Sequence, residues 1–472
     1  TWYFANDEIW ALAPHVFVLP FVAALGISTL ALKLGNLLCV IVIAVFVALP
    51  LHRVTRSWPY SILVAAGVVA AFSPFQEQVL YSQTAYGWFT AEFALLVYLA
   101  LRMLDESGPE PPGASGRIFF GASALYVLFV INLAIDSPLR AAVYWALPLV
   151  GVTVLFSRSK PGWRVLVAVT IVALLAGTAL HDVISGYVLT QAGTTARLLN
   201  RVGAWTHSLE TVSRGLPMLI GYGNAPAGWV RTLGIARVGV FGLAAVLVLI
   251  APAGNGPGSA ECRFFARVSG AMLLVVLGVL MVGTLAVDAS AARYLIAPAL
   301  LCLAAFMAIV WCRLRASAYA IALAVLFVAA FCGGGMLLVA PRAGTLAFDR
   351  DCDAPAAICR LKTALEKTGI HHGYATYWRA NVTTVASRGA ITLCAVRLSP
   401  RLEPVRWLVS KACFDTPAEE SFFLALEQGE IAKVGRDVLI REAGTPDRIL
   451  TDAGYEIWIY ATARANLDWL KR

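Results

Sequence analysis

The sequence predicts a polytopic α-helical membrane protein with a C-terminal external α/β domain. Three observations indicate this fold class. The 472 residues are 59% hydrophobic and 14% charged, whereas soluble chains carry about 25% charged residues. The last 132 residues hold 34 of the charged side chains, against 31 in the 340 residues before them. Long apolar runs recur only before that boundary, so we expect a transmembrane domain over 1–340 and an external α/β domain over 341–472.

A spanning helix needs about 20 mostly apolar residues, and ten runs in the first domain approach that length. They are 29–51, 59–75, 87–104, 118–135, 139–156, 165–180, 238–250, 268–287, 294–311 and 318–340. The stretch 9–26 is apolar but interrupted by Pro14, His15 and Pro20, so we expect interfacial helices on the outer leaflet. Because residues 1–8 resemble a loop, we expect a further transmembrane helix upstream of Thr1.

Basic loops orient these runs. Lys and Arg in short loops mark the cytoplasmic side, and every odd-numbered run is followed by such residues: Arg53 and Arg56, Arg102 and Arg117, Arg158 to Arg164, Arg263 and Arg267, and Arg313 and Arg315. The net charge of +9 is thereby explained by membrane topology, and we expect no nucleic-acid partner. The alternation places the C-terminal domain and the loops with Glu77, Asp136 and Asp288 on the external face.

The C-terminal domain alternates helix and strand patterns. We expect helices at 356–368, 380–387 and 416–428, the last with Asp415 as a possible N-cap, and strands at 373–378, 391–398, 406–409, 437–441 and 455–460. Its four cysteines can form disulfides in an oxidising compartment, with Cys352–Cys359 and Cys394–Cys413 as plausible pairs. Their spacing is not that of a zinc site.

Three stretches carry a resemblance to a known superfamily. They are the sequence 6–15 (NDEIWALAPH) followed by 23–34, the segment from 72–75 (FSPF) through 86–89 (YGWF), and 288–295 (DASAARYL). Together they resemble the GT-C-fold, polyprenyl-phosphate-sugar-dependent glycosyltransferases of the protein mannosyltransferase and aminoarabinose transferase superfamily. The resemblance implies a GT-C-like fold in the cytoplasmic (inner) membrane of a bacterium, with a periplasmic C-terminal domain.

The resemblance also implies a reaction. An inverting glycosyltransferase would move a sugar from a polyprenyl-phosphate donor to a glycan, lipid or protein acceptor at the outer face of the membrane. The superfamily places its general base in the first external loop, which here means Asp7 or Glu8. Arg293 is then the candidate for binding the lipid phosphate, together with Tyr294. Arg214 and Arg231, in the long external loop, are weaker candidates.

The sequence departs from the superfamily at a second acid. Many members carry it near the place where Tyr86 stands here, so either Glu77 or Asp136 replaces it or the second acid is absent. No cofactor is certain, and a divalent metal ion (Mg or Mn) stays open.

Simpler roles for these residues also stay open. Asp7 and Asp136 could cap helices, and Arg293 could be an interfacial anchor. Functionally, the alternatives are a catalytically inactive relative that binds a glycan or partner, and a lipid-linked sugar transporter.

Overall fold

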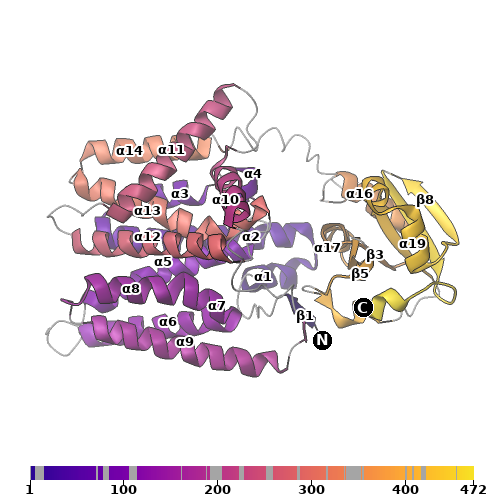
Figure 1. The fold of residues 1–472 in the computed structure, drawn as a ribbon, viewed down its shortest axis with the longest axis horizontal. Helices are drawn as coiled ribbons and strands as arrows, with labels where there is room; N and C mark the ends of the chain where they lie inside the picture. Colours follow the sequence, from indigo (N-terminus) through magenta and orange to yellow (C-terminus); the bar gives the residue numbers. More distant parts are fainter. Residues whose placement is uncertain are drawn as a thin grey trace.

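The computed structural model describes residues 2–5, 15–70, 73–77, 84–105, 114–160, 162–187, 189–191, 205–222, 228–250, 259–283, 288–314, 317–333, 335, 352, 354, 356–398, 401–406, 409–415, 421–452 and 454–471. The chain forms a helical bundle followed by a smaller α/β domain (Figure 1). The predicted fold class is confirmed in this respect. The stretch around the predicted boundary at residue 340 lies outside the described residues.

Eight described helices are long and apolar enough to cross a membrane. They are α2 (Thr29–Thr55), α5 (Thr84–Asp105), α6 (Ala114–Asp136), the continuous run α7 (Pro138–Arg140), η2 (Ala141–Ala146) and α8 (Leu147–Phe156), α9 (Trp163–Ser185), α11 (Trp229–Ile250), α12 (Ser259–Val282), and η4 (Ala289–Leu295) with α13 (Ile296–Arg313). Two shorter apolar helices, α3 (Trp58–Val69) and α14 with η5 (Ala318–Val328, Ala329–Gly333), take the places of the other two predicted spans.

The seventh and eighth predicted spans begin earlier than the sequence indicated. Helices α11 and α12 each start nine residues before the predicted position, so that Arg237, Arg263 and Arg267 lie inside helices and not in loops. An arginine can enter a helix end because its long stem packs on apolar surface while its charged end finds polar partners. Arg237 is 1% exposed and donates through Nε to the Ala330 carbonyl at 2.9 Å.

Helix α1 (His15–Leu25) packs against α2, within the stretch predicted as interfacial. The approach is close: a Cβ atom at Gly35 would lie 2.6 Å from the Val18 side chain, so only glycine fits. Leu19 and Leu25 on α1 are exposed apolar side chains. Residues 6–14, which carry the start of the predicted interfacial segment, lie outside the described residues.

The C-terminal domain contains a six-stranded mixed sheet in the order β5-β4-β3-β7-β9-β8. Strand β3 (His372–Thr376) is parallel to both β4 (Thr392–Leu398) and β7 (Ser421–Glu427). The remaining strands are antiparallel to their neighbours: β5 (Leu402–Pro404), β8 (Arg448–Asp452) and β9 (Tyr455–Ala461). The helices are α16 (Ala356–Glu366), α17 (Tyr377–Ala386), α18 (Gln428–Val434) and α19 (Arg436–Ala443).

Two predicted elements of this domain are wrong. The segment predicted as a helix over 416–428 contains β7, which lies between β3 and β9 in the sheet. Its apolar run is buried on both faces, and such a run does not distinguish a central strand from a buried helix. Asp415 follows η6 (Lys411–Phe414) and caps no described helix start. The predicted strand 437–441 is part of α19, whose Leu439 and Ala443 face the core four residues apart.

Other expectations for this domain hold. Helices α16 and α17 and strands β3, β4 and β9 occupy the predicted positions within a few residues. Both plausible disulfides, Cys352–Cys359 and Cys394–Cys413, are present. The predicted strand 406–409 is represented by β6 (Val409–Ser410), with 407–408 outside the described residues.

A second, three-stranded sheet joins distant parts of the chain. Strand β1 (Trp2–Ala5) is parallel to β2 (Leu189–Gln191), which follows α9, and antiparallel to β6 of the C-terminal domain. Tyr3 is the register partner of both Leu189 and Val409. The sheet therefore fastens the C-terminal domain to the end of the bundle where the N-terminus and the end of α9 meet (Figure 1).

Candidate functional site

A small cavity opens at the end of the bundle nearest to β1. Its walls come from α5, from the α7–η2 segment and from η4 with the start of α13. It is lined by Tyr86, Phe89, Phe93, Arg140, Tyr144, Arg293, Tyr294, Ile296 and Ala297. The cavity thus combines two arginines with a set of aromatic rings, and it includes the predicted pair Arg293 and Tyr294.

Arg293 is held by the short helix η4. The Asp288 carboxylate caps this helix by accepting a hydrogen bond from the Ser290 amide at 2.8 Å. Helix α10 (Trp205–Ile220) packs tightly on the same turn, since a Cβ at Gly215 would lie 2.5 Å from the Ala289 carbonyl oxygen. These contacts fix the backbone that carries Arg293.

The Arg293 guanidinium lies among hydroxyl groups and rings. It is 5.2 Å from the Tyr294 ring centroid and 5.9 Å from that of Tyr86, distances at which a cation is attracted to the ring face. Its Nη1 donates to the Ser290 hydroxyl at 3.4 Å. Tyr86 and Tyr294 meet edge to face at 5.9 Å, so the two phenol rings and the guanidinium form one group.

Arg140 is the second arginine of the cavity, and sequence reasoning did not single it out. It is 9% exposed, and its guanidinium lies 4.5 Å from the Phe89 ring centroid. The π-helical turn η2 follows directly, and such turns often occur at functional sites. One signal was present in the sequence: Arg140 stands in an external turn, against the bias that places arginines on the cytoplasmic side.

A buried polar cluster lies beside the arginines. Glu92 follows the cavity-lining Phe89 by one helical turn on α5, and its Oε1 accepts a 2.7 Å hydrogen bond from the Asn132 amide on α6. Asp136, one turn further along α6, lies close enough to interact electrostatically with Glu92. Glu92 and Asp136 are 0% and 1% exposed. Buried carboxylates in a membrane bundle are costly, and they commonly mark function.

Asp136 does not cap the next helix. It is the last residue of α6, and Ser137 occupies the N-cap position of α7. Its buried carboxylate instead belongs to the cluster with Glu92, one helical turn before Arg140 in the sequence.

The charged side chains of this region differ in exposure to the cavity. Arg140 and Arg293 line it, whereas Glu92 and Asp136 are buried and are not part of the lining. Hydrogen bonding from Ser290, with a contribution from the positive charge of Arg293, holds the pKa of the Asp288 carboxyl below its usual value. Asp288 is therefore ionised at neutral pH and favours the charged guanidinium next to it.

The two weaker candidates for phosphate binding, Arg214 and Arg231, do not line this cavity. Arg214 is exposed and forms a 2.5 Å ion pair with Glu210 one turn away. Arg231 is exposed, and it donates to the Tyr222 hydroxyl at 3.2 Å. These two weaker candidates for phosphate binding therefore have local partners away from the two lining arginines.

Three predicted acids cannot be assigned to the cavity from the described side chains. Glu77 ends α4 (Pro74–Glu77), and its side chain is outside the described part of the chain. Asp7 and Glu8 lie outside the described residues as well. They follow the end of β1 at Ala5 by two and three positions.

A divalent metal ion does not fit the acids that are described. No group of three His, Cys, Asp or Glu side chains converges among the described residues. Glu92 and Asp136 supply two carboxylates, but both are buried away from the open side of the cavity. Mg²⁺ usually retains several waters and needs room for them. The proposed reaction therefore assigns no step to a divalent metal ion.

Comparisons with known proteins give a faint likeness. No protein-family model and no curated protein matches the chain. The crystal structure of ArnT from Cupriavidus metallidurans in the apo state aligns with 95% of this chain and 87% of its own, at 12% identity and a TM-score of 0.42. The structure of ArnT bound to undecaprenyl phosphate aligns with 97% of this chain and 88% of its own, at 13% identity and a TM-score of 0.39. Likenesses of this extent carry no argument about residues or reaction.

Proposed function

We propose that this chain is an inverting glycosyltransferase that moves a sugar from a polyprenyl-phosphate donor to an acceptor at the outer face of the cytoplasmic membrane. The observation that supports it most is the cavity where Arg140 and Arg293 meet aromatic rings at the end of the spanning bundle. A guanidinium group binds phosphate oxygens through two parallel hydrogen bonds. Two of them in one cavity suit a phosphate that remains bound to a lipid.

The lining of the cavity suits the donor in a second respect. Phe89, Phe93 and Ile296 form the apolar part of the lining next to the arginines and are 3%, 0% and 2% exposed. Tyr86 and Tyr294 carry hydroxyl groups beside Arg293. These can donate hydrogen bonds to phosphate oxygens. The donor phosphate would then be held by charge and by hydrogen bonds from the two phenol groups.

The reaction requires one base and one stabilised leaving group. The acceptor hydroxyl loses its proton to a carboxylate and attacks the anomeric carbon. The bond between that carbon and the phosphate oxygen breaks, its electron pair stays on the phosphate, and polyprenyl phosphate leaves. A single displacement of this kind inverts the anomeric configuration. Arg140 and Arg293 would stabilise the charge that develops on the leaving phosphate.

We assign the base to Asp7, with Glu8 as the alternative, on the superfamily resemblance of the first external loop. Strand β1 supports the assignment, because its pairing with β2 and β6 holds the chain at this end of the bundle until Ala5. Glu92 and Asp136 are too buried for an acceptor hydroxyl to reach. Their burial leaves Glu77 as the remaining candidate for a second acid.

The C-terminal domain would contribute to the choice of acceptor. Through β6 it is fastened to the same end of the bundle as the cavity (Figure 1). The two disulfides of this domain are typical of an oxidising compartment such as the periplasm. A glycan, a lipid or a protein could be the acceptor.

The test is turnover in nanodiscs. The protein would be supplied with lipid-linked sugars from a bacterial membrane extract together with envelope glycans and lipids, and the release of free polyprenyl phosphate measured. We expect the double variant D7N/E8Q to lose at least about 100-fold in rate, the usual contribution of a general base. R158Q, on the opposite side of the bundle, serves as the control for loss of an exposed charged side chain.

Each other outcome has a defined meaning. Full turnover by D7N/E8Q would overturn the assignment of the base. Binding of polyprenyl phosphate without any release by the wild type would favour an inactive relative. Movement of labelled lipid across vesicles without a new glycoside would favour a transporter.

A further inference from the structure

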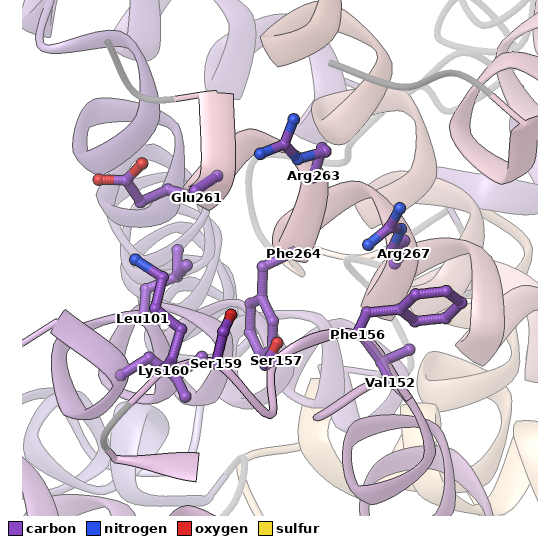
Figure 2. A pocket seen from close by; sticks show the side chains of 12 residues that line it. Leu101, Val152, Phe156, Ser157, Ser159, Lys160, Glu261, Arg263, Phe264 and Arg267 are labelled. Atoms are coloured by element: carbon purple, nitrogen blue, oxygen red, sulfur yellow. The ribbon is translucent and has the colours of Figure 1, made fainter. Parts of the chain in front are cut away.

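A second cavity, of about 110 Å³, lies at the far end of the bundle (Figure 2). The last turns of α5, the end of α8 with the segment after it, and the first turns of α12 enclose it. Its lining residues are Leu101, Leu104, Val152, Phe156, Ser157, Ser159, Lys160, Ala260, Glu261, Arg263, Phe264 and Arg267.

This cavity is separate from the candidate glycosyl-transfer site. Helix α5 contributes Tyr86 to the first cavity and Leu101 to the second. At 1.5 Å per helical residue, these positions are about 22 Å apart along the helix axis. The second cavity therefore faces the side that the basic loops mark as cytoplasmic, whatever the reaction at the first one.

The lining of the second cavity is cationic. Lys160, Arg263 and Arg267 contribute three positive charges and Glu261 one negative charge, a net of +2. The Glu261 carboxylate also lies 3.7 Å from the guanidinium of Arg56, which is outside the lining. Figure 2 shows Arg263 and Arg267 on α12, with Ser157, Ser159 and Lys160 coming from the segment after α8.

The positive-inside bias accounts for basic residues at this end of the bundle but not for their gathering around one cavity. That bias places lysines and arginines in cytoplasmic loops. Here two arginines lie within a spanning helix, four residues apart, where they repel each other. Side chains from two separate segments converge on one hollow, together with two hydroxyl groups. Such convergence of like charges is favourable when an anion is bound between them.

The surroundings show where the anion would sit. The Arg267 guanidinium lies 4.1 Å from the Phe156 ring centroid, an arrangement that leaves the edge of the guanidinium plane for an anion. Phe156 and the adjacent Leu155 are 54% and 69% exposed. These apolar side chains face the lipid at the end of a span, so acyl chains can pack beside the cavity.

We propose that this cavity is a phosphate-binding site, with Arg263, Arg267 and Lys160 as its cationic ligands and Ser157 and Ser159 as hydrogen-bond donors. The phosphate can come from the headgroup of an anionic phospholipid in the cytoplasmic leaflet or from free inorganic phosphate. Basic pockets between spanning helices on this side of a membrane commonly bind lipid headgroups.

The experiment measures phospholipid binding by native mass spectrometry of the full chain in detergent. Dioleoyl phosphatidylglycerol is titrated with and without inorganic phosphate, and dioleoyl phosphatidylcholine is the zwitterionic reference. We expect R263Q/R267Q to weaken the tightest phosphatidylglycerol binding at least about tenfold, because it removes two charge-assisted contacts. R158Q/R164Q is the matched control, since it removes two exposed arginines from the same side of the bundle without touching the cavity.

The outcomes separate the sources of the phosphate. Loss in R263Q/R267Q alone, without competition by inorganic phosphate, identifies a lipid headgroup. The same loss with competition by inorganic phosphate identifies a free phosphate site. Equal loss in both double variants, or none in either, would overturn the proposal. If R263Q/R267Q fails to fold, K160Q replaces it, and unchanged binding in K160Q would count against the site.

Discussion

The guanidinium of Arg140 lies 4.5 Å from the centre of the Phe89 ring, and both side chains line the cavity that also contains Arg293. Arg140 is the last residue of the short helix α7, whereas Arg293 belongs to the capped 3₁₀ helix η4, much later in the chain. Their meeting at one end of the bundle is the feature from which the proposed binding of a lipid phosphate follows.

The hydrogen bond from Asn132 to Glu92 joins α5 and α6 behind this cavity. Replacing Asn132 with Leu removes the donor and leaves a buried carboxylate oxygen without it. We expect a loss of about 2 kcal/mol in the free energy of unfolding, measured as a lower Tm of the purified protein in detergent. E92Q/N132L should lose less than the sum of the two single variants, because the interaction between the two side chains can be lost only once. Additive losses would contradict the coupling of the two side chains.

The cap of η4 should depend on pH. The pKa of Asp288 is lower in the folded protein, so its ionised form stabilises the fold above the unfolded value of about 4, and this stabilisation is lost as the pH falls through the lower folded value. We expect D288A to cost about 1 kcal/mol at pH 7, and the difference from the wild type to shrink below about pH 4. D288N, which keeps a capping oxygen but loses the charge, should lie between D288A and the wild type at pH 7. A difference that is the same at pH 3 and pH 7 would argue against a role of the charge.

The disulfide between Cys394 and Cys413 joins β4 to η6 in the C-terminal domain, with a sequence separation of 19. A bridge of this span stabilises a fold by about 3 kcal/mol through its effect on the unfolded chain. We expect C394A/C413A to lower the urea midpoint of this domain, and dithiothreitol to do the same to the wild type. In intact cells these two cysteines should resist a thiol reagent until a reductant is added. Immediate labelling would contradict the bridge.

The pairing of β1 with β6 should be open to crosslinking. Tyr3 and Val409 are register partners in this antiparallel pair, so their Cα atoms lie within reach of a disulfide. We expect the variant Y3C/V409C to crosslink under mild oxidation, seen as a change in electrophoretic mobility. Y3C/R441C, with the second cysteine on α19, is the control and should stay uncrosslinked. Equal crosslinking of both pairs would show that the C-terminal domain is not held in this register.

Much of the bundle follows from the sequence, because apolar length is a direct requirement of the membrane. The predicted helix starts are least accurate where arginines interrupt the apolar runs. Arg237, Arg263 and Arg267 interrupt the apolar pattern, yet they lie inside helices because their stems pack on apolar surface. The charged end of Arg237 finds a partner in the Ala330 carbonyl. In the C-terminal domain, the run Ser421–Glu427 is equally apolar on both faces, so its period does not reveal that it is a central strand.

About half of the candidate site could be predicted from the sequence. Arg293 and Tyr294 were found because a short motif resembles one in a known superfamily. The roles of Arg140 and Glu92 become visible only through tertiary contacts. Arg140 contacts the ring of Phe89, and Glu92 accepts a hydrogen bond from the amide of Asn132; both partners are distant in the sequence. No local pattern reports such pairs, although an arginine in an external turn and an acid within a span are each unusual enough to raise the question.

The measurement that tests the central claim most directly is the binding of polyprenyl phosphate to the purified protein in nanodiscs, by calorimetry. We predict that R140Q and R293Q each weaken binding about tenfold, that R140Q/R293Q weakens it about 100-fold, and that R158Q/R164Q binds as the wild type does. An affinity of R140Q/R293Q equal to that of R158Q/R164Q would contradict the account, because the cavity would then not be the site of the lipid phosphate.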